Sequence, residues 1–325
     1  MDPSRRVPLA ATGLSVTRLG LGTAPLGGLF RAVAEGEARA VVERAYELGL
    51  RLFDTAPLYG FGLAERRLGQ ILRDKPRSEI VVSTKAGVQR AGPPADDGYT
   101  YADEPVCDFS YDGVLRSFEA SLERLGLDRV DIVHIHDSDD HFEQALAGAY
   151  RALDRLRSEG TIAAVGAGMN QSEMLTEFAR AGGFDCFLLA GRYTLLDQSG
   201  LAELLPLCLE SGIAVIIGGP FNGGILADPA RAPVFDYRPA PPRVVEKALR
   251  IKAVCERNGI PLKAAAIQFP LGHAAVASVL TGCSSRAEVE ENVRMFEYEI
   301  PSSLWDDLRS EGLIAGGVPV PAASP

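Results

Sequence analysis

Short apolar runs rich in β-branched residues alternate along the chain with amphipathic stretches whose apolar residues recur at helical spacing. Alternation of strands with helices is typical of βαβ units built around a parallel sheet. The predicted strands are residues 18–24, 50–55, 80–85, 130–136, 162–167, 186–190, 213–218 and 277–282. The predicted helices are residues 36–48, 63–73, 111–125, 142–159, 172–181, 200–210, 242–258 and 286–296.

Eight strands joined by helices favour a closed (β/α)8 barrel, the TIM barrel of class α/β, over an open doubly wound sheet. No early strand runs into the G-x-G-x-x-G turn of a Rossmann fold, which disfavours that alternative. Barrels of this class reach 325 residues as one unit, so we expect a single barrel domain over residues 1–325.

Several segments lie outside this repeat. Residues 7–17 predict an N-terminal hairpin that caps the bottom of the barrel, and residues 302–312 predict an extra C-terminal helix. Residues 86–110 and 219–241 are too long for simple connections, so we expect active-site loops or lids. The sequence leaves open whether they close over the substrate. The Pro-rich tail at residues 316–325 either drapes over the site or stays disordered.

Composition narrows the function classes. Apolar residues make up 46% and charged residues 23%, a profile typical of a globular protein. The formal charge of −10, without a basic cluster, argues against nucleic acid as a partner. No apolar run is long enough for a membrane helix or a signal peptide, so we expect no membrane partner and a cytoplasmic location.

The five cysteines form no C-x-x-C pair, which argues against both a disulfide framework and a zinc site. Free thiols in a reducing compartment are the better interpretation. Cys186 and Cys283 lie in or beside strand-like runs, where a buried thiol packs as a small apolar group.

Polar residues end three consecutive predicted strands, at the edge where (β/α)8 barrels carry their chemistry. These residues are Asp54, Lys85 and His136. Parallel strands are buried on both faces, so ionisable groups at their ends must find partners. We therefore expect Asp54 and Lys85 to form a salt bridge across the barrel mouth, which keeps Lys85 charged.

Tyr59 follows Asp54 by five residues, in a turn shaped by Pro57 and Gly60 that can fold the ring over the strand ends. A phenol beside a buried ammonium has a lowered pKa, because the positive charge favours the phenolate. That would make Tyr59 an acid–base group, and His136 could hydrogen-bond a substrate oxygen. His134 shares a face with His136 and suits the core, whereas His141 and His273 look like surface or helix-end residues.

Three segments carry a family resemblance: Phe-Asp-Thr-Ala-Pro-Leu-Tyr-Gly at residues 53–60 with Glu65 after it, Ser-Thr-Lys at 83–85, and Asp-Ile-Val-His-Ile-His at 131–136. They resemble the signature segments of the aldo-keto reductase superfamily. The resemblance implies an NAD(P)-dependent oxidoreductase without a catalytic metal. It also implies that Tyr59 is the general acid/base, that Lys85 lowers its pKa, that Asp54 supports Lys85, and that His136 positions the carbonyl or hydroxyl.

The same resemblance implies contacts with a nicotinamide cofactor. Asn170 matches the residue that binds the carboxamide, with Tyr193 near it, whereas Ala190 stands where many relatives have a second amide ligand. The resemblance assigns the pyrophosphate loop to Gly218, Pro220, Asn222 and Gly224, and the adenosine segment to Gly282, Ser284, Arg286, Glu291 and Asn292.

Cofactor choice depends on two positions where NADP-preferring relatives carry basic side chains. Gly282 and Glu288 occupy them here, and a carboxylate repels a 2′-phosphate. We therefore favour NAD as cofactor, with NADP open because Arg286 lies near.

Within the superfamily, residues 22–28, 190–196 and 217–224 most resemble the D-threo-aldose 1-dehydrogenase (L-fucose dehydrogenase) group, with pyridoxal 4-dehydrogenases as neighbours. This implies oxidation of the anomeric hydroxyl of an aldose such as L-fucose or D-arabinose to a lactone. Aldehyde or ketone reduction, a metal-dependent barrel hydrolase using the His134-x-His136 pair, and a non-catalytic nucleotide-binding protein are alternatives. The expected partner is a small sugar or aldehyde, and the expected state a monomer or small homo-oligomer.

Overall fold

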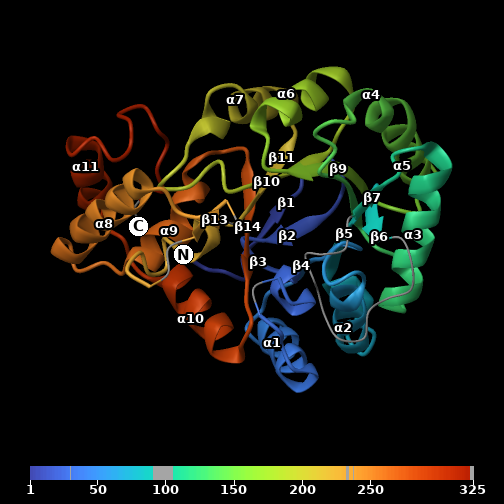
Figure 1. Cartoon of the computed structure of the whole chain (residues 1–325), viewed down its shortest axis with the longest axis horizontal. Coiled ribbons are helices and arrows are strands. Elements are labelled where there is room, and N and C mark those ends of the chain that lie inside the picture. Colours follow the sequence, from blue (N-terminus) through green and yellow to red (C-terminus); the bar gives the residue numbers. More distant parts are fainter. Residues whose placement is uncertain (30, 91–104, 232–233, 237, 323–325) are drawn as a thin grey trace.

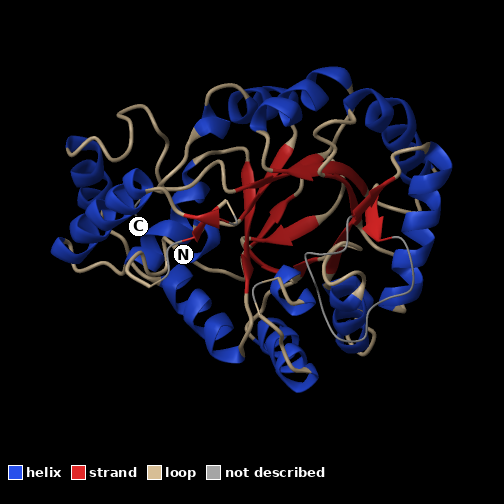
Figure 2. Ribbon diagram, viewed as in Figure 1, coloured by secondary structure: helices blue, strands red, loops and turns tan. Residues whose placement is uncertain are grey.

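Eight parallel strands close into a barrel that a ring of helices encloses (Figures 1 and 2). The structure is a computed structural model that describes residues 1–29, 31–90, 105–231, 234–236 and 238–322. The predicted (β/α)8 barrel is confirmed, because each predicted strand overlaps one strand of the barrel. In order around it these are β3 (Leu19–Gly22), β4 (Leu52–Asp54), β5 (Val81–Ala86), β8 (Ile132–His136), β9 (Ala164–Met169), β10 (Cys186–Ala190), β11 (Ala214–Gly218) and β14 (Val276–Gly282), which pairs with β3.

Side chains of the barrel strands alternate between the interior and the layer beneath the helices. In β10, Cys186 and Leu188 belong to the interior cluster, whereas Phe187 and Leu189 pack outward against the helices. Both faces are therefore apolar, which explains why the strands appear as continuous apolar runs in the sequence. The same alternation sends every second residue of β4, β5 and β8 into the barrel.

The helices around the barrel follow the predicted ones closely. Two of them, α3 (Tyr111–Leu125) and α6 (Ser172–Ala181), have the predicted bounds. The Ser110 side chain accepts a hydrogen bond from the backbone N–H of Gly113 at the start of α3, and Gly126 ends that helix in the left-handed conformation. Four others differ by one or two residues at their ends: α1 (Glu35–Glu47), α2 (Leu63–Leu72), α8 (Pro242–Arg257) and α10 (Arg286–Glu297).

Two predicted helices are interrupted. The helix predicted at 200–210 is wrong in its first part, where a 3₁₀ turn, η4 (Ser199–Leu201), precedes α7 (Leu204–Ser211). Pro206 explains the break, because a proline ring is tolerated only in the first turn of a helix. The stretch predicted at 142–159 consists of α4 (Phe142–Gln144), a π-helical segment, η3 (Ala145–Tyr150), and α5 (Arg151–Ser158).

One helix, α9 (Leu262–Gln268), was not predicted, and it continues into the 3₁₀ turn η6 (Phe269–Gly272). Six of its seven residues are buried, since it packs against both α8 and α10. Five of its seven residues are apolar and the helix is short, so the amphipathic period that reveals the other helices is absent here. The first predicted strand also ends early, because Ala24 begins the 3₁₀ turn η1 (Ala24–Gly27).

The predicted N-terminal hairpin is present as β1 (Arg6–Pro8) and β2 (Ser15–Thr17), which pair antiparallel. Leu9 and Val16 join the interior cluster with Leu52, Val81 and Ile132, the first inward residues of three barrel strands. The hairpin thus closes the amino-terminal end of the barrel and leaves the carboxyl ends of the strands to form the site.

The long segments after the third and seventh barrel strands contain short hairpins. These are β6 (Val88–Arg90) with β7 (Pro105–Cys107), and β12 (Val234–Phe235) with β13 (Arg238–Pro239). Residues 91–104, 232, 233 and 237 lie outside the described part of the chain. A further 3₁₀ turn, η5 (Asn222–Gly224), begins the second segment, and another, η2 (Arg77–Glu79), precedes β5.

The expected C-terminal helix is α11 (Ser302–Ser310), which packs beside α8 at the edge of the molecule (Figure 1). The tail, described as far as residue 322, contacts both α11 and the segment after β10. Arg309 donates a hydrogen bond to the Val318 carbonyl over 3.0 Å, and the Tyr193 hydroxyl donates to the Pro319 carbonyl over 3.2 Å. No helix in the described part of the chain combines the length and apolar composition needed to cross a membrane.

Candidate active site

A cavity of about 240 Å³ lies at the carboxyl ends of the barrel strands. Its walls come from the strands β5, β8, β9 and β10 and from the segments that follow β3, β4, β8 and β9, which agrees with where (β/α)8 barrels carry their sites. Three of the four predicted catalytic residues line it, while Asp54 lies behind Lys85. The lining residues are Ala24, Leu29, Leu58, Tyr59, Gly60, Lys85, His136, Asp137, Gly168, Met169, Asn170, Leu188 and Ala190.

The predicted ion pair between Asp54 and Lys85 is present. Lys85 Nζ lies 2.7 Å from Asp54 Oδ2, and the two side chains are only 1% and 4% exposed. The ammonium also donates to the Thr55 carbonyl over 2.9 Å, and the Ser83 hydroxyl donates to Asp54 Oδ1 over 2.9 Å. The pair is thus hydrogen-bonded on both sides, which a buried charge pair requires.

The pKa of Lys85 is raised above its usual value. Burial opposes the charge, but the attraction of Asp54 and Tyr59 and the hydrogen bonds to both side chains outweigh the loss of hydration. Lys85 therefore stays an ammonium ion in the barrel. This agrees with the prediction that it keeps its charge.

Tyr59 lies over this ammonium. Lys85 Nζ is 4.7 Å from the centre of the Tyr59 ring. Close backbone packing holds the tyrosine loop in place, because a Cβ atom at Gly27 would lie 2.5 Å from the Tyr59 carbonyl carbon. Gly60, with φ of 61°, faces Gly27 from the other side, and its own Cβ would lie 2.5 Å from the Gly27 carbonyl oxygen. The close backbone contact between these two glycines thus fixes the position of the loop that carries Tyr59.

A buried carboxylate on α2 supports the back of the site. Glu65 is fully buried, accepts a hydrogen bond from the Thr84 hydroxyl over 2.8 Å, and pairs with Arg124 over 2.5 Å. Burial raises the pKa of Glu65, although the Arg124 charge opposes that effect. Since Thr84 precedes Lys85 on the outward face of β5, this contact joins the strand to α2 and α3.

His136 faces Tyr59 across the cavity, with ring centres 5.9 Å apart in an edge-on arrangement. Burial holds the pKa of His136 well below its usual value, and the Lys85 charge lowers it further. The ring is therefore neutral. His134 lies below it in the barrel, fully buried, and the same two causes, with a smaller contribution from His136, lower its pKa to about 3. The expected core position of His134 is confirmed.

Asp137, to which the sequence pattern assigned no role, also lines the cavity. Its Oδ2 atom lies 3.4 Å from His136 Nε2. Loss of hydration raises the pKa of Asp137 to about 6, while the Lys85 charge opposes that shift. The side chain is 43% exposed and reaches solvent through the cavity that it lines. Its position next to the strand-end His136 was the only signal for it in the sequence.

The sequence analysis assigned no role to Ser83 or Gly27 either. Ser83 stands two residues before Lys85 and so shares its inward face, a signal that strand alternation provides. Gly27 had no such signal, because its contact with Tyr59 joins segments that are distant in the sequence.

The predicted cofactor residues lie at several places around the barrel mouth. Asn170, after β9, lines the cavity, and so does Ala190 at the end of β10. Gly218 adjoins them at the end of β11, where a Cβ would lie 3.2 Å from Leu188. Asn222 donates through Nδ2 to the Gly191 carbonyl over 3.0 Å, while its buried Oδ1 has no partner among the described residues.

The segment between β14 and α10 forms the other predicted part of the cofactor site. Glu288 Oε2 accepts a hydrogen bond from the backbone N–H of Ser284 over 2.7 Å, at the amino-terminal end of α10. Asn292 donates through Nδ2 to Cys283 Sγ over 3.2 Å, and its buried Oδ1 lacks a partner within the described chain. Arg286 pairs with Glu290, and Glu291 pairs with Lys263. Gly282 is exposed, next to Pro25.

The remaining residues of the predicted pyrophosphate loop, Pro220 and Gly224, carry no polar side chain. Pro220 is buried beside the exposed Gly219, and Gly224 has φ of 107° in η5, where a Cβ would meet no atom within 4 Å. No residue in the described parts of segments 86–110 and 219–241 lines the cavity.

Tyr193 lies outside the cavity lining. It is fully buried, its hydroxyl donates to the Pro319 carbonyl over 3.2 Å, and its ring packs on Phe269 with centres 5.3 Å apart. The expectation for His273 is wrong in one respect, since this residue follows η6 but is buried, 6.0 Å from the Tyr193 ring centre. His141 immediately precedes α4 and is partly exposed, as expected for a helix-end residue.

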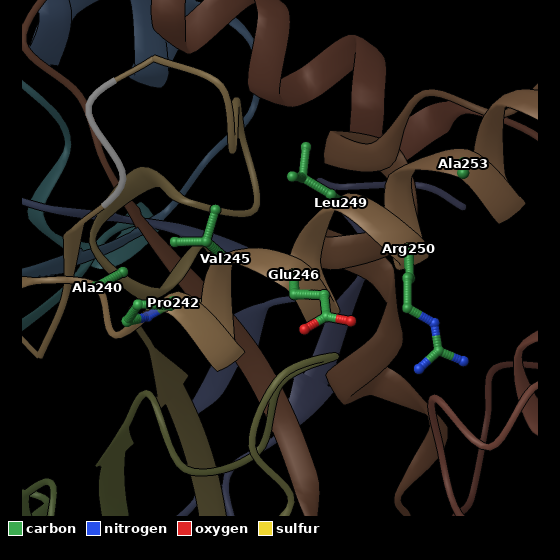
Figure 3. Close-up of a pocket in the computed structure, with 7 residues that line it drawn as sticks. All are labelled: Ala240, Pro242, Val245, Glu246, Leu249, Arg250 and Ala253. Atoms are coloured by element: carbon green, nitrogen blue, oxygen red, sulfur yellow. The ribbon is translucent and has the colours of Figure 1, made fainter.

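A second, larger hollow of about 560 Å³ lies on the outer face of α8 (Figure 3). Its charged lining residues are Glu246 and Arg250, and none of the predicted site residues borders it. We place the site at the barrel mouth despite its smaller volume, because the cavity there gathers buried, hydrogen-bonded ionisable groups.

Comparison with known proteins agrees with this geometry. Residues 18–311 match the Aldo/keto reductase family. A pyridoxal 4-dehydrogenase from Microbacterium luteolum is 44% identical and covers 97% of this chain and 99% of its own. A D-threo-aldose 1-dehydrogenase from a Pseudomonas species is 42% identical, over 94% of this chain and 97% of its own.

A solved structure of an aldo-keto reductase from Bacillus halodurans, in its holo form, superimposes with a TM-score of 0.76. It is 25% identical and covers 97% of both chains. The family match covers β5 and β8, which carry Lys85 and His136, and the loop after β4 that carries Tyr59. By its sequence and its fold, the chain belongs to the aldo/keto reductase family.

Proposed function

We propose that this oxidoreductase oxidises the anomeric hydroxyl of an aldose to the lactone, with NAD as its preferred cofactor. The observation that carries the proposal is the buried Lys85 ammonium, held by Asp54 beneath the Tyr59 ring, with neutral His136 on the opposite wall. The 42% identity with a D-threo-aldose 1-dehydrogenase supports the substrate class.

Tyr59 acts as the proton acceptor in this mechanism. The ammonium beside it favours the phenolate, since the two opposite charges attract each other in a site with little water. The phenolate takes the proton of the anomeric hydroxyl as the C1–O bond becomes a carbonyl. In the direction of carbonyl reduction, the phenol returns that proton to the oxygen.

His136 positions the reacting oxygen. Its lowered pKa keeps the ring neutral, so one nitrogen donates a hydrogen bond and the other remains an acceptor. A neutral donor binds an alcohol and a carbonyl oxygen alike. Asp54 touches neither the cavity nor the substrate in this scheme, and its role is to hold Lys85 in place and charged.

The residues around the barrel mouth suit a nicotinamide dinucleotide. Asn222 and Asn292 each keep a buried amide oxygen without a partner among the described residues, as expected of groups that await a ligand's donors. Asn170 would hold the carboxamide, and the turn from Gly218 to Gly224 would bring backbone N–H groups to the pyrophosphate. When bound, the nicotinamide ring supplies the acceptor for the hydride that leaves C1.

The preference for NAD follows from Glu288. Its carboxylate already accepts a hydrogen bond from the Ser284 backbone N–H, at the amino-terminal end of α10 where an anion would otherwise bind. A 2′-phosphate near this carboxylate meets a like charge.

A second candidate, oxidation of pyridoxal, is favoured by the 44% identity with a pyridoxal 4-dehydrogenase.

The alternative of a metal-dependent hydrolase is weaker, because the Lys85 ammonium occupies the position beside Asp54 where a cation would have to bind. The described residues also contain no group of three His, Cys, Asp or Glu side chains suited to a metal ion.

The test is the formation of NADH from NAD by the wild-type chain and by Tyr59→Phe, with L-fucose, D-arabinose and pyridoxal as substrates. We expect oxidation of the sugars, and a loss of at least about 100-fold in kcat for the variant. Its affinity for NAD should stay that of the wild type. An active variant would refute the mechanism. Oxidation of pyridoxal but of neither sugar would refute the aldose as substrate and favour the second candidate function.

A further inference from the structure

Asp137 is the one ionisable residue of the cavity lining that the mechanism above does not use. It directly follows β8, so its position is tied to that of His136. The carboxylate Oδ2 lies 3.4 Å from His136 Nε2, and the side chain is 43% exposed, whereas that of Lys85 is 1% exposed. A ligand in the cavity can therefore reach Asp137 directly.

The backbone at Asp137 is held in an uncommon conformation. Its φ is 40°, in the left-handed region that residues other than glycine seldom adopt. Its N–H donates to the Gly168 carbonyl over 3.1 Å, which keeps the residue joined to β9. Such backbone conformations cost free energy and persist where the surrounding structure holds them, often at ligand sites.

Most other lining residues are apolar or glycine, among them Leu29, Leu58, Met169 and Leu188. Asp137 therefore provides a strong hydrogen-bond acceptor in a cavity wall that has few polar side chains. An ionised carboxylate accepts hydrogen bonds from hydroxyl groups and repels anions. The cavity is thus suited to a neutral substrate that carries hydroxyl groups.

We propose that Asp137 is a specificity residue, which accepts a hydrogen bond from the hydroxyl on the carbon next to the reacting carbon. The inference rests on the proposed function and names the part of the sugar that the site recognises. His136 holds the reacting oxygen, and Asp137 Oδ2 lies 3.4 Å from His136 Nε2. The two side chains are therefore close enough to bind the oxygens of two adjacent carbons, one oxygen each, at hydrogen-bond distance.

Three substrates separate recognition from chemistry. D-Arabinose and 2-deoxy-D-ribose differ only in the hydroxyl at C2, and 2-hydroxytetrahydropyran keeps the anomeric hydroxyl alone. The measured quantity is the ratio of kcat/KM for D-arabinose to that for 2-deoxy-D-ribose. We expect the wild-type chain to favour D-arabinose, because only that sugar supplies the donor for Asp137.

Asp137→Asn removes the charge and retains a residue that tolerates this φ, and Asp137→Gly removes the acceptor altogether. We expect the ratio to fall by about 10-fold in the first variant and by up to about 100-fold in the second. The rate with 2-hydroxytetrahydropyran should change by less than about threefold. Asp140→Asn is the matched control, since Asp140 is an exposed residue of the same loop outside the cavity lining.

An unchanged ratio in both variants would overturn the inference, and so would an equal loss with all three substrates. Melting temperature and NAD affinity show whether each variant is folded. If the wild-type chain oxidises none of the three compounds, the proposed function itself fails. The same ratio is then measured in the direction of reduction, with glyceraldehyde against 3-hydroxypropanal, which again differ only in the neighbouring hydroxyl. A ratio insensitive to Asp137 there would refute the role as well.

Discussion

Replacement of Lys85 by methionine tests the electrostatic centre of the site. Methionine keeps much of the length of the side chain and removes its charge. Asp54, with a side chain 4% exposed, then loses its ion-pair partner and keeps the Ser83 hydroxyl as a donor. Loss of one partner of a buried ion pair destabilises a protein by about 3–5 kcal/mol, because the other charge stays buried.

The effect on melting follows from the chain length. At 325 residues the entropy of unfolding near the melting temperature is about 0.7 kcal/mol/K, so Lys85→Met should lower that temperature by roughly 4–7 °C. Asp54→Asn in the same chain should recover part of the loss, since no unpaired carboxylate then remains. The assay is calorimetry of the wild type, both single variants and the double variant.

The pH dependence of this coupling has a definite sign. The pKa of Lys85 is raised in the folded state, so its contribution is fully present below the unfolded pKa of about 10.4 and is lost as pH rises through the folded value. The coupling free energy should therefore be constant between about pH 6 and pH 9. Additive losses in the double variant, within about 0.5 kcal/mol, would refute this account of the ion pair. Lys85→Met should also lower kcat by at least about 100-fold.

Three further outcomes follow from the site. The His136 ring should show no titration between about pH 6 and pH 9 in nitrogen NMR spectra, because its pKa is held low; a midpoint near 6.5 would contradict this. Gly27→Ala should destabilise the chain by about 2 kcal/mol or more and lower kcat, since the new Cβ would lie 2.5 Å from the Tyr59 backbone; Gly36→Ala, where a Cβ meets no atom within 4 Å, is the control. Glu288→Gln keeps an acceptor for the Ser284 N–H and removes the charge, so NADP affinity should rise by about 5-fold or more by fluorescence titration, with a smaller change for NAD. An equal change for both cofactors would remove Glu288 as the basis of the preference.

The local pattern of the sequence was sufficient for most of the barrel. Buried parallel strands appear as apolar runs, and strand ends in a (β/α)8 barrel meet at one edge, so Asp54, Lys85 and His136 could be placed together before the structure was known. Tyr59 could be added because its turn follows Asp54 closely. The pairing of Asp54 with Lys85 needed only the rule that buried charges require partners.

Contacts between distant segments were beyond that pattern. Three features depend on how closely two distant segments approach each other, and such contacts produce no periodic pattern of apolar residues in the sequence. They are the backbone packing of Gly27 on Gly60, the burial of Tyr193 and the burial of His273. The helix α9 escaped prediction because it is short and mostly apolar.

The sequence by itself thus determined the barrel, the order of its strands and the identity of the groups at its mouth, since periodicity and charge are local properties of the chain. Only the tertiary structure decided which of those groups share a cavity, and it placed Asp137 there and Tyr193 outside it. The physical reason is that burial, pKa and hydrogen bonding depend on the atoms that surround a group, and in a closed barrel most of those atoms come from elsewhere in the chain.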